Sequence, residues 1–106
     1  MTNVKYDGVI EAVRYAPDGK VSLARVYERR GPAFSDRILV SRSELIQRLN
    51  SGEKFMIGKR LPRMGGMFEV SSKVRLVKKN NIEWLQTSQP EQSSQERDVL
   101  EGAPLF

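Results

Sequence analysis

Arginine and aromatic residues alternate in the middle of the chain, in a pattern typical of a surface that holds phosphates and flat rings. A guanidinium group matches a phosphate with two parallel hydrogen bonds, and an aromatic ring offers a base a stacking surface worth roughly 1–3 kcal/mol. The pattern predicts binding of single-stranded DNA or RNA; the alternative is an ordinary strand face with both rings in the core. The candidate residues are Arg25, Tyr27, Arg29, Arg30, Phe34 and Arg37.

A second basic group follows at Lys59, Arg60 and Arg63, next to Gly65 and Gly66. Glycines let a loop move, and basic loops often close over a bound strand. The segment is not a phosphate-binding loop of the nucleotide-hydrolysing type, because it lacks the Gly-Lys-Ser/Thr ending and leads into a predicted strand. We expect these side chains to extend the same binding surface; an ordinary exposed loop is the alternative.

Catalytic and metal-binding residues are scarce. The chain has no Cys and no His, which excludes disulfides, thiolate and imidazole catalysis and most zinc, haem and iron–sulfur ligand sets. The carboxylates show no metal-binding spacing either. We therefore expect a protein that is not an enzyme and that needs no cofactor and no metal.

The net charge of +5 is distributed unevenly. Residues 1–86 carry +8, from 17 basic and 9 acidic side chains, whereas residues 87–106 carry −3. A basic domain followed by an acidic tail is typical of proteins that contact a polyanion. A charged surface that only keeps the protein in solution is the alternative.

Strands must position most of these side chains. Alternation of apolar residues predicts strands, and a capping box from Ser41 to Glu44 opens one helix that ends at Asn50-Ser51-Gly52. Ala16–Gly19 and Asn80-Asn81 are turn sequences, and the segment from Arg29 to Asp36 reads as a loop. The predicted strands span residues 6–15, 21–28, 37–40, 54–57 and 68–77, the last bent near Ser71-Ser72, with a short sixth strand at 82–85.

The predicted fold is mainly β with one helix, a small barrel of five to six strands in the order β-β-β-α-β-β, formed by residues 1–86. This order matches the OB-fold, whose helix lies between the third and fourth strands. An SH3-like barrel or an α+β roll is the alternative. The start of the chain lacks the apolar run of a signal peptide, and no stretch approaches the ~20 residues that span a membrane, so we expect a cytoplasmic protein.

Residues 87–106 form a predicted disordered tail, because Ser, Gln, Glu and Pro dominate until apolar residues return at Val99–Phe106. The layout resembles bacterial single-stranded DNA-binding proteins, in which a polar linker joins an OB domain to an acidic tip ending in Pro-Phe. Asp98, Glu101, Pro104 and Phe106 carry the resemblance, although Leu105 separates the proline from the phenylalanine.

The resemblance implies a tip that recruits protein partners and can fold back on the basic groove. The partner-binding candidates are Pro104, Leu105 and Phe106. A protein–protein adaptor that acts through this tip or through a barrel edge is the alternative to nucleic-acid binding, and a frayed terminus without function is the alternative for the tip itself.

Overall fold

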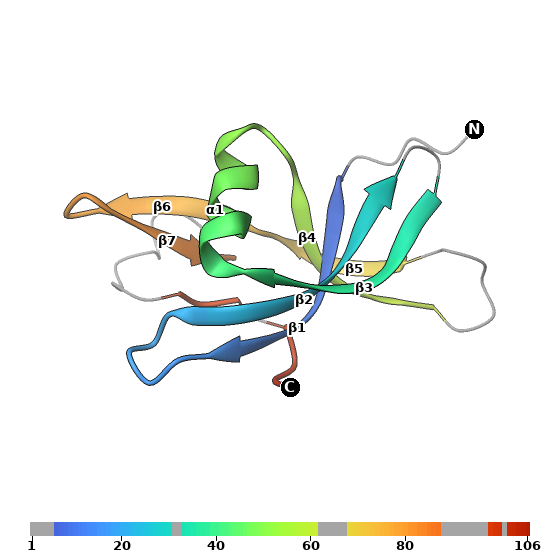
Figure 1. Ribbon diagram of the computed structural model, residues 1–106, viewed down its shortest axis with the longest axis horizontal. Helices are drawn as coiled ribbons and strands as arrows, with labels where there is room; N and C mark the ends of the chain where they lie inside the picture. Colours follow the sequence, from blue (N-terminus) through green and yellow to red (C-terminus); the bar gives the residue numbers. More distant parts are fainter. Residues whose placement is uncertain (1–5, 31–32, 62–67, 88–97, 101) are drawn as a thin grey trace.

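The computed structural model describes residues 6–30, 33–61, 68–87, 98–100 and 102–106. These residues form a mainly β fold with one helix, which confirms the predicted class (Figure 1). The elements are β1 (Gly8–Tyr15), β2 (Val21–Arg30), β3 (Ala33–Ser41), α1 (Arg42–Asn50), β4 (Phe55–Arg60), β5 (Phe68–Lys73), β6 (Arg75–Lys79) and β7 (Ile82–Gln86).

Five strands form one sheet in the order β3-β2-β1-β4-β5, and β6 and β7 form a separate hairpin. β1 is antiparallel to β2 and parallel to β4. The sheet order contains no pairing between β3 and β5, so the predicted barrel is not closed in the described ranges. These two edges nevertheless approach each other at one end, because the ring centroids of Phe34 on β3 and Phe68 on β5 are 4.7 Å apart.

The turns and the helix ends follow the sequence closely. Asp18 accepts a hydrogen bond from the backbone of Lys20 in the β1–β2 turn, and Asn80 and Asn81 both have positive φ in the β6–β7 turn. The backbone N–H of Glu44 donates to the side chain of Ser41 at 3.3 Å, which confirms the predicted N-cap. Both hairpins and the start of α1 can therefore be explained by local residues alone.

One core lies between the five-stranded sheet, α1 and the hairpin, and Figure 1 shows α1 near β6 and β7. Leu45 is the fully buried residue of the helix. Arg48 holds the helix to the sheet, because it pairs with Glu28 at 2.9 Å and Glu53 at 2.8 Å and stacks on Phe55. The hydrogen bonds that Arg48 donates to the Glu53 carboxylate raise the pKa of Arg48 above its usual value, so this cation stays charged.

Several predicted strand boundaries differ from those of the structure. β3 begins at Ala33 inside the predicted loop, and β4 continues to Arg60. The predicted strand 68–77 is two strands in different sheets, and it breaks at Val74 instead of at the two serines. Val74 is buried at this break, and its N–H still donates to Phe55 O at 2.9 Å, so contact with β4 extends one residue beyond β5 before β6 begins.

The chain returns to the domain after Thr87. Asp98 and Leu100 are each only 3% exposed, and Val99 forms a parallel bridge with Gln86. The sequence predicts that residues 87–106 lie outside the domain, but Asp98–Leu100 pack into it. The segment 88–97, where disorder is predicted, lies outside the described residues.

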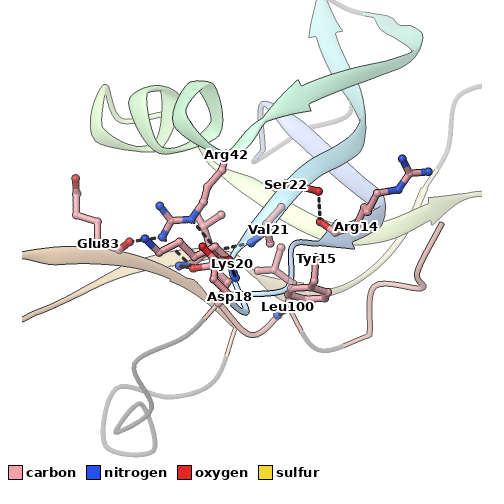
Figure 2. A network of polar contacts seen from close by, with 11 residues as sticks. Arg14, Tyr15, Asp18, Lys20, Val21, Ser22, Arg42, Glu83 and Leu100 are labelled. Atoms are coloured by element: carbon pink, nitrogen blue, oxygen red, sulfur yellow. Dashed lines mark hydrogen bonds and ion pairs between the residues drawn. The ribbon is translucent and has the colours of Figure 1, made fainter.

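Asp98 is held by four donors. Its carboxylate accepts from the backbone N–H groups of Val21 at 2.7 Å and Leu85 at 2.8 Å, and from Arg42 at 2.7 and 3.1 Å. Figure 2 shows Arg42 reaching from the start of α1 toward Glu83, whose carbonyl oxygen accepts another of its hydrogen bonds. A buried carboxylate needs such partners, and here they come from β2, α1 and β7.

Candidate nucleic-acid interface

Glu11 and Tyr27 form the centre of the candidate site, because side chains from three neighbouring strands meet there. A register shift in β1 between Ile10 and Ala12 places Glu11 beside β2, where Tyr27 donates its hydroxyl hydrogen to Glu11 Oε2 at 2.6 Å. Arg37 Nε, from β3, donates to the same hydroxyl at 3.0 Å and lies 3.4 Å from the carboxylate.

Arg25 completes this group, which we name the Glu11 cluster: Glu11, Arg25, Tyr27 and Arg37. Arg25 Nε lies 3.1 Å from Glu11 Oε1, yet this buried nitrogen makes no hydrogen bond within the described chain. The contact is therefore an ion pair by distance, with the N–H not directed at the oxygen. Two guanidinium groups and one phenol share a single carboxylate, so the cluster keeps a positive charge.

Three further aromatic rings, from three segments, lie next to the Glu11 cluster. The Phe68 ring centroid is 5.0 Å from that of Tyr27 and 4.7 Å from that of Phe34, and Tyr6 lies 5.9 Å from Phe34. The Arg60 guanidinium lies 4.7 Å from the Tyr27 centroid and 5.4 Å from the Phe68 centroid. Such cation–π contacts favour a charged guanidinium at this place.

Exposure separates the residues that a ligand can reach from those that it cannot. The Arg37 side chain is 58% exposed, and the rings of Phe34 and Phe68 are half-buried. Tyr27 is only 3% exposed. A base cannot stack on it, so the predicted stacking role of Tyr27 does not fit the structure; the residue instead positions Glu11 and Arg37.

The structure brings together some of the predicted basic and aromatic residues and leaves others apart. Arg29 is two residues from Tyr27 on β2, which puts it on the same face. Lys59 is adjacent to Arg60 on β4, so its exposed side chain points to the opposite face, 3.7 Å from Glu69. The side chain of Arg30 and all of Arg63 lie outside the described residues. The predicted residues that meet are Arg25, Tyr27, Phe34, Arg37 and Arg60.

Sequence reasoning missed Glu11 and Phe68 as members of the site. The sequence could have indicated Glu11 as a site residue, because a carboxylate among the apolar residues of a predicted strand needs a partner. Its partners were not detectable, since they depend on the β1 bulge and on the register of β2 and β3. The sequence predicted Phe68 only as part of the strand 68–77.

The predicted tip residues, Pro104–Phe106, lie beside β1 and bind its backbone. Val13 N–H donates to Pro104 O at 2.9 Å, and Phe106 N–H donates to Val13 O at 3.2 Å. The Phe106 ring makes cation–π contacts with two guanidinium groups, with its centroid 4.8 Å from Cζ of Arg14 and 4.9 Å from Cζ of Arg25. Arg25 therefore touches both the Glu11 cluster and the tip.

No protein-family model matches the chain, and no curated protein or solved structure matches it significantly. The function of this protein therefore has to be inferred from the geometry of its site. Within the described ranges, α1 is too short and too polar to cross a membrane. The same ranges hold no group of three or more carboxylates arranged to bind a metal ion.

Proposed function

We propose that this protein is a non-catalytic binding module for single-stranded nucleic acid. Arg25, Arg37 and Arg60 would contact phosphates, and the exposed parts of Phe34 and Phe68 would meet bases. The observation that carries the proposal is the meeting of three guanidinium groups around one carboxylate and one set of rings. Positive charge beside rings is the combination that sequence-independent strand binders use.

The charge balance supports an anionic ligand. Glu11 is a single carboxylate in contact with two arginines, and Arg60 has no acidic partner in the described part of the chain. The Glu11 carboxylate would repel a phosphate placed directly above it, so phosphates would bind at the outer sides of Arg25, Arg37 and Arg60. Tyr27 would keep Arg37 in place through its hydroxyl.

The test is a fluorescence anisotropy titration of a labelled mixed-sequence single strand of roughly 16 nucleotides, the upper size of one OB-type site. Three phosphate contacts predict a slope of log K against log salt of roughly −2, so affinity should fall roughly 20-fold between 50 and 200 mM salt. Arg37→Gln and Arg60→Gln should each weaken binding and reduce the slope by about 0.7.

Lys78→Gln is the matched control, because Lys78 is exposed on β6, away from the Glu11 cluster, and carries the same charge change. It should bind like the unchanged chain. Equal losses in all three variants would indicate a general charge effect and would contradict the proposed site. No binding at low salt would remove the proposal altogether.

A protein–protein adaptor is the second candidate. It is favoured by Leu39, whose side chain is exposed on β3, an edge strand of the sheet. Edge strands present unpaired backbone groups to other chains. A partner that binds the unchanged chain but not a Leu39→Lys variant, together with no oligonucleotide binding, would favour the adaptor.

A further inference from the structure

The second half of β1 lacks a neighbour from the main sheet on one side. β4 pairs with β1 only at Gly8, Val9 and Ile10, so beyond Ile10 the sheet continues only on the β2 side. The free side at Val13 holds Leu105 in a parallel bridge. A strand edge of this kind accepts an added peptide through its backbone groups.

The segment Pro104–Phe106 binds this edge as a peptide ligand would. Both backbone groups of Val13 are used, one toward Pro104 and one toward Phe106, and neither bond depends on a side chain. The ring of Phe106 adds selectivity, because it contacts Arg14 and Arg25. Arg14 Nε also donates to the main-chain oxygen of Phe106 at 3.1 Å.

The same segment contributes little to the core. Leu105 is 73% exposed and Pro104 is exposed, whereas Asp98 and Leu100 are buried a few residues earlier. The two parts are separated at Gly102, whose φ is +87°. Asp98–Leu100 are therefore a fixed part of the fold, and Pro104–Phe106 occupy a surface site that can be emptied without opening the core.

We propose that the β1 edge at Val13 is a peptide-binding site, filled here by residues 104–106 and able to take an extended segment of a partner protein. The segment would place an aromatic side chain against Arg14 and Arg25. Proline fits at the first position, where only a carbonyl is used, but not at the third, where an N–H must donate. A basic residue at the third position would be repelled by the two arginines.

A peptide fits this site better than a nucleobase does. A base also stacks on guanidinium groups, but its ring does not supply a carbonyl and an N–H two residues apart that match Val13. The inference goes beyond the proposed nucleic-acid binding, because it concerns another edge and a neutral ligand. Its salt dependence should therefore be weak.

The test uses the full chain and a fluorescein-labelled peptide, Gly-Ala-Pro-Leu-Phe with an amidated end. The chain's own segment competes at an effective concentration of about millimolar, so the unchanged protein should bind the probe weakly. Phe106→Ala removes the competing ring and should bind the probe about ten-fold more tightly. Adding Arg14→Gln to that variant should reverse the gain, and adding Lys78→Gln should not.

Two matched peptides complete the test. Replacing the probe's Phe by Ala should weaken binding about ten-fold, whereas replacing its Leu, which corresponds to the exposed Leu105, should change little. Equal binding of the Phe and Ala peptides would overturn the proposal. It would also be overturned if an oligo(dT) strand displaced Phe106 from β1 and the peptide did not. If the Phe106→Ala variant does not fold, the NMR signals of the Phe106 ring can be followed in the unchanged chain as excess peptide is added. Ring signals that do not shift would contradict the proposed peptide site.

Discussion

Tyr27 is the residue on which the polar half of the candidate site depends. It is buried, its hydroxyl donates to Glu11, and the same oxygen accepts from Arg37. A phenol in this position fixes two charged side chains from neighbouring strands. In the proposed binding function, its contribution would therefore be indirect, through the direction in which Arg37 points.

Tyr27→Phe should lower the free energy of unfolding by about 1–2 kcal/mol, because one buried hydroxyl that bonds to two charged groups is lost. Urea unfolding measures the effect. Tyr6→Phe is the control, since Tyr6 contacts Phe34 through its ring and makes no hydrogen bond through its hydroxyl in the described structure. Equal stability of the two variants would show that the Tyr27 hydroxyl contributes nothing.

At the same scale, the sequence indicated the positive and aromatic members of the site but not their arrangement. Alternation along β2 correctly placed Arg25 and Tyr27 on one face. It did not reveal that a ring from β5 covers Tyr27, since β5 is distant in sequence and its place in the sheet depends on long-range pairing.

The strands β4 and β5 meet at a close approach that requires glycine. A Cβ on Gly58 would lie 2.5 Å from the carbonyl oxygen of Glu69, nearer than real Cβ atoms come. The pairing register also shifts between Ile57 and Gly58. This contact holds β5 in the position from which Phe68 reaches Phe34 and Tyr27.

Gly58→Ala should therefore force β5 away from β4 and destabilise the protein by about 1–3 kcal/mol. Hydrogen exchange should speed up in β5 and leave α1 unchanged. Gly52→Ala serves for comparison: it strains a positive φ of +98° but meets no atom within 4 Å. Its effect should stay at the end of α1, and faster exchange in β5 for that variant would contradict this account.

Local residues specify the elements better than they specify the pairing. The capping serine, the Pro-Asp-Gly turn and the Asn-Asn turn each act within a few residues, so the helix and both hairpins were predictable. The parallel pairing of β1 with β4, and the separation of β5 from β6 at Val74, depend on what the core needs from distant segments. Apolar alternation does not contain that information.

At the scale of the whole molecule, Asp98 joins three elements through one side chain. It connects the start of β2, the start of α1 and β7 through bonds to Val21, Arg42 and Leu85. The sequence presented this aspartate as part of an acidic tail. Its burial could not be read from a segment that follows so many polar residues, because the partners lie up to 77 positions away.

Asp98→Asn should destabilise the protein by about 3 kcal/mol, because Arg42 then loses its buried charge partner and an amide N–H₂ faces backbone donors. Thermal and urea unfolding measure this change. Asp18→Asn is the matched control, since Asp18 is exposed and accepts one local bond. If the two variants were equally stable, Asp98 would not hold the elements together.

The lateness of Asp98 and Leu100 in the chain also affects how the protein is made. During synthesis β1 and β2 emerge first, while the carboxylate for Val21 and the side chain that fills the core beside them are still missing. Until Leu100 and Asp98 are available, β1 and β2 expose apolar surface to water, and this state favours aggregation. A nascent chain of this protein thus reaches its native packing only after residue 100 has left the ribosome.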